Sequence, residues 1–318
     1  MSEAWLAPAT LAELLAALAG GAALPAGGAT DLLPRHKQGL LPVSRLACTR
    51  VPELRRLRIA DEGIELGAAL TLRELIEHEE LRVRYPAIAR CLALVGAPQH
   101  RHAGTLGGNL CLDTRCQWYN QSARWRLAVD GCLKCGGADC HVQPGGTRCH
   151  AALSSDGAPL FIALGARARL LTARGERELP LEALYRREGR EHLELAPGEL
   201  LAQVLLEPPR GARATYHKLR LRESFDYPLL GAAGCLRAED GRVRSLRLCF
   251  GAAAPWPVLL DEVALGAAGS PPAELDRDAL AECCRAACGQ PSGALPHPAW
   301  RRAMVPVLAA RVLKDLGI

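Results

Sequence analysis

The segment V-G-A-P-Q-H-R-H-A-G-T-L-G-G-N-L, residues 95–110, runs directly into C-L-D-T-R-C-Q-W-Y-N-Q-S, residues 111–122. The first segment contains the glycine turn G-T-L-G-G-N at residues 104–109, which would let backbone amides approach a phosphate. The second segment opens a cysteine-rich stretch that continues to residue 150 and is typical of a metal-binding loop. A function for this chain has to explain why a phosphate-binding turn adjoins a metal-binding loop.

A second glycine turn, P-A-G-G-A-T-D-L-L at residues 25–33, follows a short expected strand. Either turn alone could be an ordinary tight turn. The pattern differs from the dinucleotide-binding G-x-G-x-x-G motif, because the glycines are adjacent and no third glycine opens a helix. Two such turns in one chain favour a single extended ligand that carries two phosphates.

Composition limits the broad class of the protein. The chain has 318 residues, enough for about two domains, and its 49% hydrophobic content excludes a disordered chain. The net charge of +5 comes with scattered arginines, which does not indicate a nucleic-acid-binding surface. We expect no secretory signal and no membrane span. Thirteen cysteines then indicate reduced or metal-bound thiols in a cytoplasmic protein.

Local patterns predict a mixed α/β region followed by a smaller α+β region. Capping boxes that start at Thr10 and Thr71 predict helices. The apolar run P-L-F-I-A-L-G-A, residues 159–166, predicts a buried strand, and R-A-R-L-L-T, residues 167–172, predicts a half-buried one. The sequence P-P-R-G at residues 208–211 is the clearest linker.

The cysteine-rich stretch is expected to be an insertion, because hydrophobic periodicity disappears over residues 111–150. Four of its cysteines are separated by 15, 7 and 8 residues: Cys116, Cys132, Cys140 and Cys149. This spacing matches neither a zinc ribbon nor a bacterial ferredoxin. The polar, glycine-rich surroundings favour thiolate-bound metal over inert thiols, but the spacing leaves the metal open, including zinc with His141 or His150 as nitrogen ligands.

Three segments together resemble the FAD-binding medium subunit of molybdenum hydroxylases. They are A-G-G-A-T-D-L, G-T-L-G-G-N and Y-H-K-L-R-L-R-E-S-F-D-Y-P-L-L-G-A-A, which starts at Tyr216. The resemblance covers nearly the whole chain in order. It implies a two-subdomain α/β FAD-binding domain of the vanillyl-alcohol-oxidase (PCMH) type over residues 1–210, with the cysteine-rich insert, and a small C-terminal α+β domain over residues 211–318.

The resemblance also implies which residues bind FAD. The backbone of the first glycine turn would hold the pyrophosphate, Asp156 would contact the ribityl side, and Lys218 would lie near the isoalloxazine ring. The implied cofactor-binding residues are Ala26, Gly27, Gly28, Ala29, Thr30, Asp31, Gln99, His100, Gly104, Thr105, Gly107, Gly108, Asn109, Asp156 and Lys218.

The insert narrows the resemblance to the 4-hydroxybenzoyl-CoA reductase branch of that family, whose flavin subunits carry an extra [4Fe-4S] cluster. The four spaced cysteines, Cys116, Cys132, Cys140 and Cys149, would be its ligands, whereas Cys111 and Cys135 fall outside the pattern. The chain would then have no substrate site of its own. It would pass electrons from a ferredoxin-type donor through the cluster and FAD, for reductive dehydroxylation to benzoyl-CoA.

The implied partners are a large subunit with a molybdenum cofactor and a small subunit with two [2Fe-2S] clusters, in a dimer of heterotrimers without nucleic acid or membrane. Two alternatives stay open at this point. One is the flavin subunit of an oxidative molybdenum hydroxylase similar to xanthine or CO dehydrogenase, with outward electron flow. The other is a flavoprotein scaffold whose insert is stabilised by zinc.

Overall fold

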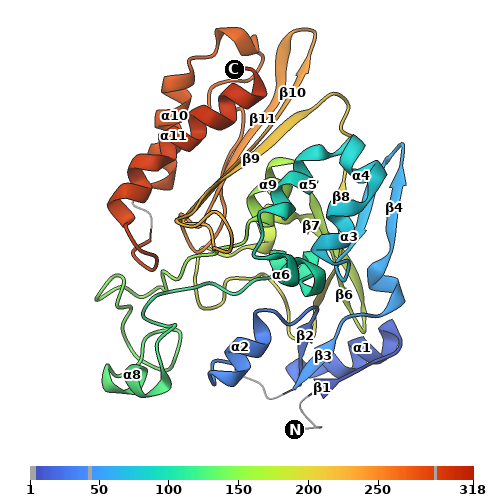
Figure 1. Ribbon diagram of the computed structural model, residues 1–318, viewed down its shortest axis with the longest axis vertical. Helices are drawn as coiled ribbons and strands as arrows, with labels where there is room; N and C mark the ends of the chain where they lie inside the picture. The colour runs from blue at the N-terminus through green and yellow to red at the C-terminus, as the bar shows by residue number, and fades with distance from the viewer. Residues whose placement is uncertain (1–4, 42–44, 290–291) are drawn as a thin grey trace.

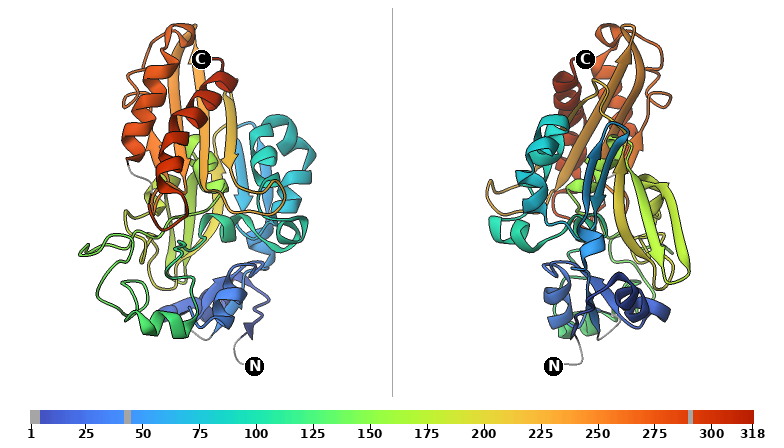
Figure 2. Two further views of the ribbon diagram at one scale, coloured as in Figure 1. Left: turned by 60° about the vertical axis from the view of Figure 1, so that its left-hand side comes forward. Right: turned by 90° about the vertical axis from the view of Figure 1, so that its right-hand side faces the viewer.

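The computed structural model describes residues 5–41, 45–289 and 292–318. Its strands form three sheets that follow one another along the long axis of the molecule (Figure 1). The apolar pattern L-L-P-V-S, residues 40–44, predicts a short strand, but part of this segment lies outside the described residues. The cysteine-rich insert extends to one side, next to the N-terminal sheet (Figure 2).

The N-terminal sheet is parallel, with strand order β1-β3-β2. Helix α1 begins where the capping box predicts, and Thr10 Oγ1 accepts a hydrogen bond from the amide of Glu13. Strand β2 leads into the first glycine turn, and α2 follows the turn. The bounds are β1 (Trp5–Leu6), α1 (Leu11–Leu18), β2 (Leu24–Ala26), α2 (Leu32–Lys37) and β3 (Leu46–Cys48).

The middle sheet has five antiparallel strands in the order β4-β5-β8-β6-β7. Its strands are β4 (Leu57–Ala60), β5 (Gly63–Gly67), β6 (Arg167–Thr172), β7 (Gly175–Pro180) and β8 (Leu200–Leu206). The helices that accompany it are α3 (Leu72–Glu77), α4 (Glu79–Arg84), α5 (Pro86–Ala93), α6 (Pro98–Ala103), α7 (Leu106–Leu110) and α9 (Gly157–Ala163). The capping box at Thr71 is confirmed at the start of α3.

The strand predicted over residues 159–166 is wrong, because this segment contains most of the helix α9. Every residue of α9 is buried. A short run that is apolar on all sides has no periodicity to separate a helix from a strand. The helix packs against the C-terminal sheet and against helices α5 and α7, and its apolar residues belong to the same core as those of the middle sheet.

The C-terminal sheet is antiparallel in the order β12-β11-β10-β9, and two helices cover one of its faces (Figure 1). The bounds are β9 (Arg213–Leu219), β10 (Leu230–Glu239), β11 (Arg242–Gly251), β12 (Val258–Leu260), α10 (Arg277–Cys288) and α11 (Pro298–Leu316). The α+β character predicted for this region is confirmed. The insert between α7 and α9 is mostly irregular and contains the short helix α8 (Ala123–Ala128).

Candidate FAD-binding site

The two glycine turns, which lie far apart in the sequence, are packed directly against each other. A Cβ atom on Gly27 would overlap the side chain of Thr105, and one on Gly28 would overlap the carbonyl of Ala103. Only glycine at these positions permits so close a backbone approach. The fold thus brings the two predicted phosphate-binding motifs into one place.

The joined turns form part of the wall of a large cavity, with a volume of about 1420 Å³. Ala29 adopts a left-handed conformation with φ of 52°. Alternation of right- and left-handed residues turns successive amides toward a common point, which suits an anion. The predicted FAD-binding residues that line the cavity are Gly27, Gly28, Ala29, Thr30, Asp31, His100, Gly104, Thr105, Gly107, Gly108, Asn109 and Asp156.

The side chains of Thr105 and Asn109, in the second turn, form hydrogen bonds that hold this turn in place. Thr105 Oγ1 caps α7 by accepting a hydrogen bond from the amide of Gly108 at 3.1 Å. Asn109 Oδ1 accepts hydrogen bonds from Ser155 Oγ at 2.9 Å and from the amide of Gly157 at 3.0 Å. Asn109 therefore fixes the second glycine turn to the segment that carries Asp156.

Asp156 lies in the cavity wall and is held by two side chains from β9. Lys218 Nζ lies 2.9 Å from Asp156 Oδ2, and the hydroxyl of Tyr216 donates to Asp156 Oδ1 at 2.7 Å. Burial raises the pKa of Asp156, and the Lys218 ammonium opposes this rise. Lys218 also donates to the carbonyl of Leu94 at 2.9 Å. Lys218 itself does not line the cavity. Its ammonium lies behind Asp156, which does.

The rim of the cavity includes residues that the sequence patterns did not identify. His100 stacks on Phe225, with ring centroids 4.9 Å apart. Phe225 and Tyr227 belong to the β9–β10 loop and line the cavity, although both are exposed. Gln99 is exposed and Ala26 is completely buried, and neither contributes to the lining. The sequence shows the aromatic residues Phe225 and Tyr227, but it does not show that Phe225 lies against His100.

The four spaced cysteines converge within the insert. Cys116, Cys140 and Cys149 are buried, and Cys132 is half-buried. The pKa of Cys149 is raised to about 11, mainly by burial and in part by the neighbouring Cys140. Cys140 acts in the same way on the pKa of Cys116, which burial also raises. Cys149 likewise contributes to the raised pKa of Cys132, so the four side chains are close enough to interact.

Within the described part of the chain, no three histidine, cysteine or carboxylate side chains are placed to hold a single metal ion. Among these residues the structure therefore shows no site for a single zinc ion, and the predicted cluster stays a prediction. His141 Nε2, for instance, lies 2.6 Å from the carbonyl oxygen of Gly131. The donor set still fits an iron–sulfur cluster, because its four irons take one thiolate each and need no three ligands on one ion. Cys135 lies beside Cys132, with 3.5 Å between the sulfurs, and lines the cavity.

A chain of ion pairs, which we call the ion chain, connects the first glycine turn to the cysteine insert. It runs Lys134–Asp113–Arg35–Asp31–Arg115. The Lys134–Asp113 distance is 2.7 Å and the Arg35–Asp113 distance is 2.5 Å. All five side chains are at most 16% exposed. The predicted FAD contact Asp31 thus directs its carboxylate to arginines, one of which lies in the insert.

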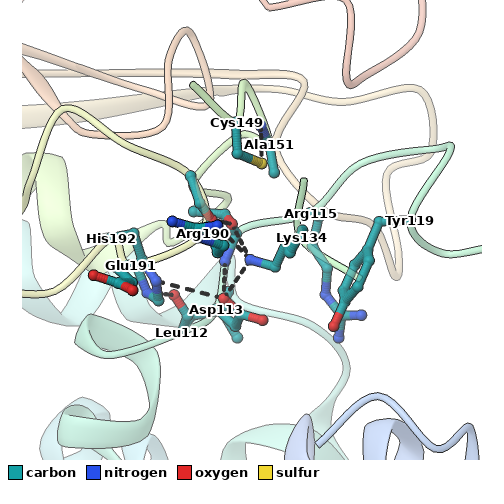
Figure 3. Close-up of polar contacts among 12 residues, drawn as sticks. Leu112, Asp113, Arg115, Tyr119, Lys134, Cys149, Ala151, Arg190, Glu191 and His192 are labelled. Carbon is teal, nitrogen blue, oxygen red and sulfur yellow. Dashed lines mark hydrogen bonds and ion pairs between the residues drawn. The ribbon is translucent and has the colours of Figure 1, made fainter. Parts of the chain in front are cut away.

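His192 borders the ion chain (Figure 3), and its Nδ1 lies 3.4 Å from Asp113 Oδ1. Its Nε2 lies 3.0 Å from the carbonyl oxygen of Leu112. Burial lowers the pKa of His192 to about 4, despite the opposing influence of Asp113. His192 is therefore neutral at pH 7 and adds no charge to this wall of the cavity.

Comparisons with known proteins support FAD binding by this chain. Residues 1–208 match the family described as the FAD binding domain in molybdopterin dehydrogenase. Residues 214–316 match the CO dehydrogenase flavoprotein C-terminal domain. The first match contains both glycine turns and the whole insert.

Among the helices of the described segments, none combines the length and apolar character that a membrane span requires.

Individual relatives come from several dehydrogenases. The aldehyde oxidoreductase FAD-binding subunit PaoB of Escherichia coli K12 is 32% identical over 250 residues, which cover 75% of this chain and 77% of that protein. The carbon monoxide dehydrogenase medium chain of Afipia carboxidovorans is 27% identical over 286 residues, or 88% of this chain and 85% of that one.

A comparison with solved structures finds the same fold in a carbon monoxide dehydrogenase. A crystal structure of cyanide-inactivated Cu,Mo-CO dehydrogenase superposes with a TM-score of 0.76 at 24% identity, covering 98% of this chain and 96% of that one. This likeness confirms the predicted fold class. With the family match over residues 1–208, it shows that the chain belongs to the FAD-binding medium subunits of the molybdenum hydroxylase family.

Proposed function

We propose that this chain is the FAD-carrying electron-transfer subunit of an oxidative molybdenum hydroxylase complex. The observation that carries the proposal is the direct packing of the two glycine turns on one cavity, which gives an extended phosphate-bearing ligand two backbone cradles. The relatives support it, since they include FAD-binding subunits of an aldehyde oxidoreductase and a putative xanthine dehydrogenase, and the medium chain of a carbon monoxide dehydrogenase. By analogy, a large molybdenum subunit and a small iron–sulfur subunit would be its partners.

The residues of this chain would bind and orient the cofactor. FAD, when bound, supplies a carrier that accepts one or two electrons. Amides of the two turns would receive the pyrophosphate, while Asp156, fixed by Lys218 and Tyr216, would receive a hydroxyl of the ribityl chain. The rings of His100 and Phe225 narrow the rim, which would limit access of water to the flavin.

We further propose that the insert binds a [4Fe-4S] cluster through Cys116, Cys132, Cys140 and Cys149. The assignment is supported by the resemblance of the insert and by the proximity of these four cysteines, three of which are buried. A bound cluster supplies one-electron chemistry. The cysteine insert also favours a second candidate function, a ferredoxin-dependent reductase of the 4-hydroxybenzoyl-CoA reductase branch, in which electrons flow inward.

The test is anaerobic analysis of the complex for FAD, iron, sulfide and zinc, with EPR spectroscopy after dithionite reduction. We expect one FAD and, beyond the iron and sulfide of the small subunit, about four irons and four sulfides for each copy of this chain. Cys140→Ser should lose these four irons and the EPR signal of their cluster, whereas Cys283→Ser, at an exposed position on α10, should keep both. Zinc without this additional sulfide would refute the cluster.

Turnover assays separate the two candidate functions. Oxidation of aldehydes or purines with an artificial acceptor would support the oxidative hydroxylase. Dehydroxylation of 4-hydroxybenzoyl-CoA with reduced ferredoxin, without such oxidation, would support the reductase instead. Absence of FAD from the purified complex would contradict both.

A further inference from the structure

Lys134 is a buried cation between the cysteine insert and the FAD cavity. Its side chain is 5% exposed, and the residue lines the cavity. The ammonium donates to Asp113 at 2.7 Å, to the carbonyl of Gly189 at 2.8 Å and also to Thr114 Oγ1. Burying an ammonium is costly, so three oxygen partners, one of them in an ion pair, indicate that its position is fixed.

The partners of Lys134 connect it to the cysteine site. Gly189 accepts from Lys134, and its own amide donates to the carbonyl of Cys149 at 2.9 Å. A Cβ atom on Gly189 would lie 3.0 Å from Cys149 Sγ, so the absence of a side chain at residue 189 lets its backbone lie close to the Cys149 sulfur. Figure 3 shows Lys134 on the Cys149 side of Asp113, with His192 on the other.

The charges along the ion chain do not cancel. Three cations alternate with two carboxylates, so the chain begins and ends on a cation, Lys134 and Arg115. Both cationic ends belong to the insert, and each is adjacent in sequence to a cysteine, Cys135 or Cys116. A positive charge in a low-dielectric site stabilises nearby negative charge.

We propose that Lys134 is a positioning residue that holds the cysteine loop against the flavin domain and raises the reduction potential of the cluster bound there. This inference rests on the proposed cluster. Reduction adds one negative charge to the cluster, and a fixed cation beside it favours the reduced form. Asp113 anchors the cation and partly offsets its charge.

The test compares variants of the whole complex by potentiometric titration of the cluster EPR signal, with iron and FAD content measured on the same samples. Lys134→Gln removes one positive charge and should lower the ratio of reduced to oxidised cluster about tenfold at a fixed potential, or 59 mV for a one-electron couple. Asp113→Asn removes one negative charge and should shift the potential in the opposite direction. Lys134→Arg should stay near the wild-type value.

Lys314→Gln is the matched control, because this lysine is exposed on α11. If the role of Lys134 were purely structural, the Lys134 and Asp113 variants would shift the reduction potential of the cluster in the same direction, or both would lose the iron of the cluster. If Lys134→Gln does not accumulate as folded protein, Asp113→Asn still decides, since an unchanged or lowered potential contradicts the inference. A wild-type complex without iron beyond that of the small subunit overturns the cluster and this inference together, whereas a complex that has this additional iron but unshifted variants overturns this inference alone.

Discussion

Lys218 and Asp156 form an ion pair of 2.9 Å in which the two side chains are only 1% and 4% exposed. The lysine comes from β9 at the start of the C-terminal domain, and the aspartate precedes α9 in the wall of the FAD cavity. The pair therefore fastens the C-terminal sheet to the cofactor site. Its burial means that neither charge can be removed without a large penalty for the other.

We predict that Lys218→Met destabilises the protein by about 3–5 kcal/mol at pH 7, because it leaves the Asp156 carboxylate buried without its counter-ion. Burial already raises the pKa of Asp156, and loss of Lys218 raises it further. The penalty should therefore be present above this raised pKa and disappear as the pH falls through it. Urea unfolding of the wild type and the variant at several pH values measures this, and Lys37→Met, at an exposed lysine, is the control. A penalty that does not change with pH contradicts the argument.

Gly28→Ala tests the contact between the two glycine turns. The new Cβ atom would overlap the Ala103 carbonyl and force the turns apart, at a cost of about 1–3 kcal/mol. We expect FAD to bind at least about tenfold more weakly, which the absorbance of retained flavin after gel filtration measures. In Gly293→Ala the Cβ atom would make an ordinary 3.4 Å contact with Val142, so this control should retain FAD. Equal retention in both variants would show that the turns tolerate separation.

Local sequence patterns predicted much of the fold but only part of the site. The capping boxes at Thr10 and Thr71 marked true helix starts, because their hydrogen bonds span three residues. The ion pair between Asp31 and Arg115 joins residues 84 positions apart, and no local pattern encodes such a partner. The stacking of Phe225 on His100 was invisible for the same reason.

The lowered pKa of His192 predicts that the protein loses stability in mild acid. Its folded pKa of about 4 lies below the value of about 6.5 in an unfolded chain, so the unfolded state binds more protons between these values. Stability should fall as the pH decreases through this window, by about 3 kcal/mol in total from this group. In His192→Gln the decrease should be smaller by that amount, as measured by unfolding at pH 7 and pH 4. His102→Gln, at an exposed histidine, should follow the wild type.

Arg301 in α11 is completely buried and holds the C-terminal domain together through backbone carbonyls. It donates to Leu229 and Ser292, each at 2.7 Å, and to Ala252. Burial lowers the pKa of Arg301 to about 10, which leaves it charged at neutral pH.

Because Arg301→Met deprives all three carbonyls of their donor, we predict a loss of about 3 kcal/mol or more in the free energy of unfolding. Thermal unfolding, followed by near-ultraviolet circular dichroism, measures it. Arg311→Met, on an exposed part of the same helix, should change stability by less than about 0.5 kcal/mol. The iron and FAD content of folded Arg301→Met should equal that of the wild type, since the residue lines neither the cavity nor the cysteine site. Similar stability of the two arginine variants would mean that water replaces the guanidinium at the three carbonyls.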